Sequence, residues 1–156
     1  MKKNFPTTLA LGAAFFALTL TTGAGAPSVN VMPKEPTITV YKDPSCGCCN
    51  SWVSLMRSAG FEISVRDTSD TQSIKRRYHV PAALASCHTA LVGGYVVEGH
   101  VPADLISRLL KEKPRVLGLA VPGMPVGSPG MEGGTKEAYD VVTFDATGKS
   151  AVFARR

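Results

Sequence analysis

Three cysteines fall within four residues of this chain, in the run Cys46-Gly47-Cys48-Cys49. The preceding residues, 37–41, alternate apolar and polar side chains as a half-buried strand does, and residues 48–59 carry apolar side chains at helical spacing. The cysteines are therefore expected on a strand-to-helix turn, at or near the N-terminus of the helix. Free N–H groups and the helix dipole favour a thiolate there, which makes a cysteine a better nucleophile and metal ligand.

The rest of the apolar pattern predicts further strands and helices. In order, the expected elements are strand 37–41, helix 48–59, strand 61–66, helix 70–78, strand 89–92, strand 95–98 and a helix from Pro102 to Lys111. This β-α-β-α-β-β-α order is that of the thioredoxin fold, an α/β class. A long loop rich in Gly, Pro and Met, residues 115–134, is expected without secondary structure, and residues 141–144 and 150–153 predict a C-terminal β-hairpin.

The first 26 residues have the pattern of a signal peptide. Met1 to Asn4 is basic, Leu9 to Leu20 is apolar, and Ala24-Gly25-Ala26 matches an A-x-A cleavage site. The apolar run is shorter than the roughly 20 residues that a membrane anchor needs. We therefore expect a signal peptide (1–26), a flexible arm (27–36) and one folded domain (37–156). The mature protein is expected in the periplasm if the source is Gram-negative, with no membrane attachment after cleavage.

The distribution of charge argues against a nucleic-acid partner. The formal net charge is +5, and the loss of Lys2 and Lys3 with the signal peptide lowers it to +3. Basic residues are scattered apart from Lys75-Arg76-Arg77 and Arg155-Arg156, and no aromatic residues alternate with them. We therefore expect no binding of nucleic acid, and we interpret Lys75-Arg76-Arg77 as a solvent-exposed helix face.

Other segments are expected to reach the same edge of the sheet as the cysteine run. Cys46 and Cys49 have the C-x-x-C spacing of a redox pair. Cys87 comes just before the third strand, which runs antiparallel to the first in the expected topology and so starts beside the turn. His88 takes the position where thioredoxins have a cis-proline, and His100 follows the fourth strand at the same edge. The sequence therefore predicts that all four cysteines and these two histidines converge.

Four thiols and an imidazole in an exported protein indicate a metal site. Thiolates and thioethers select Cu(I), although four thiolates can also hold Zn²⁺ or an iron–sulfur cluster. The clustered cysteines are too close in sequence for one unstrained tetrahedron, which favours a multinuclear, thiolate-bridged copper cluster or a mixture of metal and redox roles. Met124 and Met131 are candidate thioether ligands, and His88 is a candidate ligand, hydrogen-bond partner or spacer. The expected metal ligands are Cys46, Cys48, Cys49, Cys87 and His100.

Four segments of the sequence resemble a known family. The first three are Tyr41-Lys42-Asp43-Pro44-Ser45-Cys46-Gly47-Cys48-Cys49, Ser86-Cys87-His88-Thr89 and Val97-Glu98-Gly99-His100-Val101-Pro102-Ala103. The fourth, residues 123–132, contains Gly123-Met124-Pro125 and Gly127-Ser128-Pro129-Gly130-Met131-Glu132. In this order they are similar to the CopG-type proteins, exported metal-binding proteins associated with bacterial copper resistance. The resemblance covers roughly residues 37–133 and implies a thioredoxin-like fold, copper binding through the C-x-C-C cysteines and Cys87, and thiol or copper redox activity. It does not account for the C-terminal hairpin.

Two functions follow from these patterns, and a third remains open. The first is a periplasmic copper-binding protein for copper tolerance, which binds Cu(I) and cycles its oxidation state, with copper-handling or redox proteins as partners. The alternative is a thiol–disulfide oxidoreductase in which the catalytic residues are Cys46, as attacking thiol, and Cys49, as resolving thiol. A protein held only by structural disulfides would allow three pairings of the four cysteines, and would leave their position at a helix N-terminus unexplained.

Overall fold

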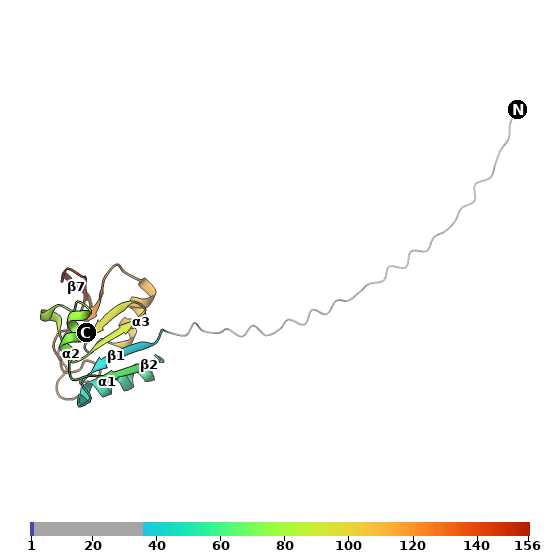
Figure 1. Ribbon diagram of the computed structural model, residues 1–156. Coiled ribbons are helices and arrows are strands. Elements are labelled where there is room, and N and C mark those ends of the chain that lie inside the picture. The colour runs from blue at the N-terminus through green and yellow to red at the C-terminus, as the bar shows by residue number, and fades with distance from the viewer. Residues whose placement is uncertain (2–35) are drawn as a thin grey trace. The chain divides into compact units, whose positions relative to one another are not determined.

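Residues 36–156 fold around a seven-stranded mixed sheet, as the computed structural model shows (Figure 1). The structure describes residue 1 and residues 36–156, so the predicted signal peptide and arm lie almost wholly outside the described residues. The strands are β1 (Ile38–Lys42), β2 (Ile63–Asp67), β3 (Thr89–Val92), β4 (Tyr95–Glu98), β5 (Gly118–Ala120), β6 (Asp140–Phe144) and β7 (Ser150–Arg155). The helices are α1 (Gly47–Ser58), α2 (Thr71–Arg77) and α3 (Ala103–Glu112), with a short 3₁₀ turn at Ala82–Leu84.

The predicted α/β class and the order β-α-β-α-β-β-α are confirmed, and the order is compatible with a thioredoxin-like core. The strands lie in the order β2-β1-β3-β4-β5-β6-β7 across the sheet. β1 is parallel to β2 and antiparallel to β3, where Tyr41 lies opposite Thr89, and β3 is antiparallel to β4, where Thr89 lies opposite Glu98. The end of β1, the start of β3 and the end of β4 therefore share one edge of the sheet.

Helices cover both faces of the sheet. Successive residues of a strand point to opposite faces, so each strand contributes apolar side chains to both. The larger apolar cluster contains Ala90 and Val97 together with buried side chains of α1 and α3. The smaller cluster contains Val96 and packs against Leu91 and the segment that follows α2. α1 and α3 thus lie on one face and α2 on the other. None of the helices in the described residues combines the length and apolar character of a membrane span.

The structure differs from the sequence prediction in the loop expected over residues 115–134. Residues Gly118–Ala120 form β5, which pairs parallel to β4 and antiparallel to β6, and so joins the C-terminal hairpin to the sheet. A Cβ atom on Gly118 would lie 1.8 Å from the carbonyl oxygen of Val96. A three-residue strand that begins with a glycine for close backbone approach carries no alternating pattern, so the sequence did not reveal it.

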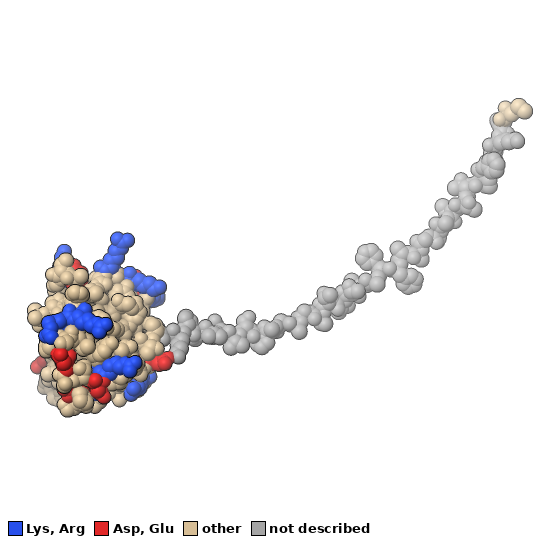
Figure 2. Space-filling view, viewed as in Figure 1, with Lys and Arg blue, Asp and Glu red and all other residues tan. Residues whose placement is uncertain are grey.

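The interpretation of Lys75-Arg76-Arg77 as a solvent-exposed face is wrong for Lys75. Lys75 is 3% exposed, and its Nζ lies 2.6 Å from Oε1 of the fully buried Glu98. Arg76 and Arg77 are exposed as expected. On the face shown in Figure 2, basic and acidic side chains are interspersed and form no single basic patch.

Candidate metal centre

The turn between β1 and α1 places the clustered cysteines at the first residues of the helix. Cys46 is the N-cap of α1, and its sulfur accepts a hydrogen bond from the backbone N–H of Cys49 at 3.3 Å. Cys46 and Cys49 are joined by a disulfide bond, whereas Cys48 and Cys87 are free thiols. Cys49 is buried, and the other three cysteines are partly exposed. The two cysteines of the C-x-x-C pair therefore form a disulfide at the N-terminus of α1.

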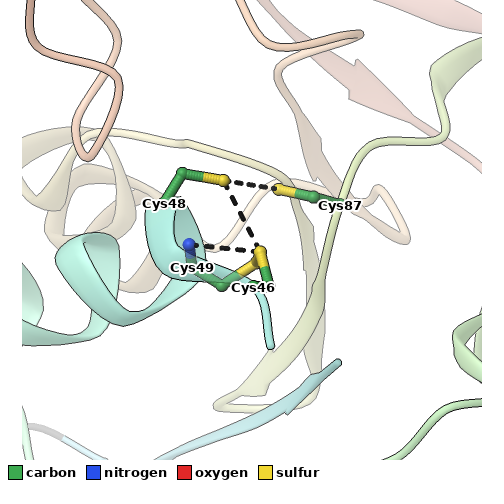
Figure 3. A group of neighbouring side chains, drawn as sticks. All are labelled: Cys46, Cys48, Cys49 and Cys87. Atoms are coloured by element: carbon green, nitrogen blue, oxygen red, sulfur yellow. Dashed lines mark hydrogen bonds between the residues drawn. A yellow bond between two sulfur atoms is a disulfide. The ribbon is translucent and has the colours of Figure 1, made fainter. Parts of the chain in front are cut away.

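The Cys48 sulfur is next to both Cys46 of this disulfide and Cys87 (Figure 3). Its Sγ is 3.5 Å from Sγ of Cys46 and 4.0 Å from Sγ of Cys87. All four cysteine sulfurs lie within 4.8 Å of one another, although Cys87 comes from the start of β3. The shared edge of the sheet brings Cys87 to the turn, as the sequence analysis predicted.

His100 also reaches this cluster, and its hydrogen bonds determine which ring nitrogen carries the proton. Nδ1 lies 2.7 Å from the carbonyl oxygen of Pro129, and Nε2 lies 2.8 Å from Sγ of Cys87. Because a carbonyl only accepts, Nδ1–H is the donor and Nε2 presents its lone pair to the sulfur. Burial lowers the pKa of His100 and keeps the ring neutral. A histidine held by a backbone carbonyl on one nitrogen, with the other free, is the usual arrangement of a metal ligand.

His88 follows Cys87 in the chain, contacts Trp52 of the larger apolar cluster, and is fully buried. Its ring packs on Trp52 at a centroid distance of 4.5 Å and meets the edge of His100 at 5.2 Å. Nδ1 lies 3.5 Å from Sγ of Cys87, whereas Nε2 has no hydrogen-bond partner. Burial, with further contributions from His100 and nearby lysines, lowers the pKa of His88 well below its usual value. The ring is therefore neutral and incompletely hydrogen-bonded.

The surroundings of the Cys87 thiol disfavour its ionised form. Burial, and then the neighbouring Cys48, raise the pKa of Cys87 to about 12. The hydrogen bond with Nε2 of His100 is therefore made by a neutral thiol and a neutral imidazole.

The long loop closes one side of the centre. Pro129 anchors His100, and the next residue, Gly130, presses against the start of α1 with its φ at +87°. A Cβ at Gly130 would lie 2.7 Å from the carbonyl oxygen of Cys48. Met124 is half-exposed and lines a hollow of about 330 Å³ with Cys87, and Met131 is partly buried in the same loop.

A buried polar network behind the centre was missed by the sequence analysis. Glu98 accepts hydrogen bonds from Lys75, from Thr89 Oγ1 at 2.7 Å, and from the backbone N–H of Ser86 at 2.6 Å. Because Ser86 precedes Cys87, this network fixes the backbone from which the Cys87 thiol projects. The available signal was a glutamate at an inward-facing position of a strongly apolar strand.

These residues form a donor set suited to a soft metal. Once the disulfide is reduced, four sulfurs and one lone pair of a neutral imidazole face a common space, and thiolates favour Cu(I) over hard cations. In the disulfide form, only two of the four cysteines keep a thiol. Reduction of the disulfide would therefore double the number of thiols at this centre from two to four.

The chain resembles proteins associated with copper resistance. Two solved structures, described as forms 1 and 2 of the copper resistance protein CopG, each match with a TM-score of 0.74 and 42% identity. Each match covers 78% of this chain and 98% of the CopG chain. Residues 84–131 match a family model described as DUF411, a protein of unknown function. No curated protein sequence matches the chain.

Proposed function

Because the chain belongs to the CopG family of copper resistance proteins, we propose that it is an exported protein of copper tolerance that binds Cu(I). The observation that carries this proposal is the convergence of four cysteine sulfurs within 4.8 Å, drawn from two segments of the chain. The ligands are Cys46, Cys48, Cys49, Cys87 and His100. Copper is the cargo of this site, and its delivery or removal would involve other periplasmic copper-handling or redox proteins.

The reduced site has more thiolates than one Cu(I) requires. Four cysteine sulfurs within 4.8 Å of one another would crowd more thiolate charge around a single Cu(I) than it can neutralise. Thiolates that bridge two ions relieve this conflict, so we propose a multinuclear cluster. His100 supplies a terminal nitrogen, held in place by Pro129.

The disulfide supports a redox role for copper at this centre. Two Cu(II) ions accept one electron each from the thiolates of Cys46 and Cys49, which yields two Cu(I) ions and one disulfide. In the reverse direction, two Cu(I) ions reduce the disulfide to two thiolates and leave as Cu(II). Each disulfide thus exchanges two electrons with two copper ions.

A thiol–disulfide oxidoreductase is the second candidate, favoured by the same disulfide. In that function, the Cys46 thiolate of the reduced protein attacks a disulfide of the partner and displaces one partner thiolate. Cys49 then attacks Cys46 in the mixed disulfide, which releases the second partner thiolate and closes the Cys46–Cys49 disulfide. Cys48, with its sulfur 3.5 Å from that of Cys46, would compete with Cys49 for the mixed disulfide at Cys46. Because of this competition, disulfide exchange with a partner is the less favoured of the two candidate functions.

The test is an anaerobic Cu(I) titration of the reduced protein, with the thiols counted before and after. We expect more than one Cu(I) per chain and absorption from thiolate-to-copper charge transfer. Saturation at one copper, or retention of Zn²⁺ against added Cu(I), would contradict the multinuclear cluster.

Cys48→Ser separates the two functions. We expect this variant to bind fewer Cu(I) ions, or to bind them more weakly in competition with a chromophoric chelator, because it lacks the sulfur between Cys46 and Cys87. Disulfide reductase activity should be low in both proteins. Ser54→Ala, on the exposed side of α1, is the control. Strong reductase activity that survives in Cys48→Ser, together with unchanged copper binding, would favour the oxidoreductase.

A further inference from the structure

A second set of donors shares Cys87 with the four-sulfur cluster. Sγ of Cys87 and one nitrogen each of His88 and His100 lie within 4.8 Å of one another. Both histidines are fully buried, and each has a ring nitrogen that faces Cys87. This set differs from the four-sulfur cluster because it needs neither Cys46 nor Cys49, and therefore persists when those two residues form a disulfide.

His100 is already oriented for this second set. Its Nδ1–H donates to Pro129, so the Nε2 lone pair points at Cys87. The 2.8 Å between Nε2 and Sγ is a hydrogen-bond distance, so a small separation of the two atoms would let a metal ion replace the thiol proton.

Packing alone does not explain why a histidine occupies position 88. An apolar ring would pack on Trp52 equally well, whereas a buried imidazole nitrogen without a partner costs about 1–3 kcal/mol. With the proton on Nε2, the Nδ1 lone pair faces Cys87 at 3.5 Å. Ligands at about 2.3 Å (S) and 2.1 Å (N) around a tetrahedral ion are separated by about 3.6 Å. The Cys87–His88 distance is thus already close to that of two ligands of one ion.

The charges around this set do not oppose a dication. Lys75 and Lys42 contribute to the lowered pKa of His88, but each is paired with a carboxylate. Nζ of Lys75 lies 2.6 Å from Glu98, and Nζ of Lys42 lies 2.9 Å from Asp67. One thiolate and two imidazoles form a borderline donor set, which suits Cu²⁺ and Zn²⁺ better than an all-sulfur set suits them.

We propose that the disulfide form of this protein binds one borderline divalent ion, of the Cu²⁺ or Zn²⁺ class, through Cys87, His88 and His100. This goes beyond the proposed function, which concerns Cu(I) and the reduced thiols. The protein would then keep a metal site in both thiol oxidation states, with Cys87 as the ligand common to the two. Cu(I) prefers thiolate ligands, and imidazole nitrogen suits Cu(II). The sulfur-rich reduced site and the nitrogen-rich site of the disulfide form therefore match the two oxidation states of copper.

Co²⁺ is the appropriate probe because it is spectroscopically visible and does not oxidise thiols. The titration uses Cys48→Ser protein under anaerobic conditions, with the Cys46–Cys49 disulfide verified by intact mass, so that Cys87 is the single free thiol. We expect one Co²⁺ per chain, with thiolate-to-cobalt charge transfer and the visible bands of a four-coordinate ion. Absence of charge transfer at saturation would overturn the proposal.

His88→Phe on the same background tests the least expected ligand and preserves the contact with Trp52. We expect its Co²⁺ affinity to fall at least about tenfold, the lower bound for loss of even an outer-shell partner of a metal. His79→Asn is the matched control, because His79 is exposed, lies away from the donor set and has a left-handed φ of 54° that asparagine tolerates. Unchanged Co²⁺ affinity and spectrum in His88→Phe would show that His88 is not a ligand.

A measurement without substitution of His88 covers the case in which His88→Phe does not fold. In the Co²⁺-loaded Cys48→Ser protein, two ring N–H protons of metal-bound histidines should give strongly shifted, solvent-exchangeable NMR signals. One such signal, or none, would overturn the proposal. Because the Cu(I) titration uses reduced protein, either proposal can fail while the other stands.

Discussion

The fold determines both the position and the protonation of Cys87, the residue common to the two proposed metal sites. Its thiol donates to a neutral His100, and its backbone is held through Ser86 and the Glu98 network. Burial and Cys48 raise its pKa to about 12, so the metal-free protein has little Cys87 thiolate at neutral pH. The cysteine best placed to be a shared ligand is thus held as a thiol until a metal displaces its proton.

The raised pKa predicts how Cys87 reacts with iodoacetamide. Only the thiolate reacts, and below the pKa its fraction rises about tenfold per pH unit. In the native disulfide form we therefore expect the alkylation rate of Cys87 to keep rising between pH 7.5 and 10.5, whereas in urea-unfolded protein it should level off near the ordinary thiol pKa. Peptide mass spectrometry measures both rates. A native rate that levels off at the same pH as the unfolded rate would contradict the raised pKa.

At the scale of elements, the loop after β5 is part of the centre and not only a connection. Pro129 holds His100, and Gly130 allows the loop to touch the first turn of α1. Any Cβ at Gly130 meets backbone atoms, the carbonyl oxygen of Cys48 at 2.7 Å and the amide nitrogen of Trp52 at 2.8 Å, which cannot move cheaply. The loop and α1 must therefore separate if a side chain is added.

Gly130→Ala should accordingly destabilise the protein and weaken its metal site together. Gly123→Ala is the matched control, because Gly123 has a positive φ of +69° in the same loop and nothing within 4 Å of an added Cβ. We expect Gly130→Ala to lower the free energy of unfolding by about 1–3 kcal/mol more than Gly123→Ala does. We also expect weaker Cu(I) binding by Gly130→Ala, because Pro129 no longer holds His100. Equal effects of the two variants on unfolding and on copper would mean that the contact with α1 is unimportant.

The sequence predicted the parts of the fold that depend on local pattern. Apolar alternation predicted β1 to β4, and the direction of the strands then placed Cys87 and His100 beside the turn. β5 was missed because its pairing depends on Val96 in another strand. Lys75 was misjudged because a basic run predicts an exposed face unless a buried carboxylate lies opposite, and Glu98 reaches it only through the tertiary fold. The periodicity of apolar residues therefore does not predict pairs of residues that are far apart in the sequence, such as Lys75 and Glu98.

At the scale of the whole molecule, the disulfide and the predicted leader sequence favour the same kind of compartment. A disulfide beside two free thiols is kept in an oxidising environment and is reduced in the cytosol. The leader, with its apolar run and Ala24-Gly25-Ala26, is the sequence feature that would take the chain to such an environment. We propose that export determines the starting oxidation state of the centre.

Expression of the full chain in a Gram-negative host tests this relation between leader and centre. We expect the protein in the periplasmic fraction, with an intact mass that corresponds to a chain beginning at Pro27 and lower by two hydrogens for the Cys46–Cys49 disulfide. Replacing Ala24 and Ala26 by glutamate should block cleavage and leave a longer, membrane-retained precursor, because the A-x-A site requires small residues. A control variant, Ser28→Glu, changes the charge just beyond the site and should still be cleaved. Full-length protein in the cytoplasm with four alkylatable cysteines would contradict export, and the centre would then begin its function as a four-thiol site.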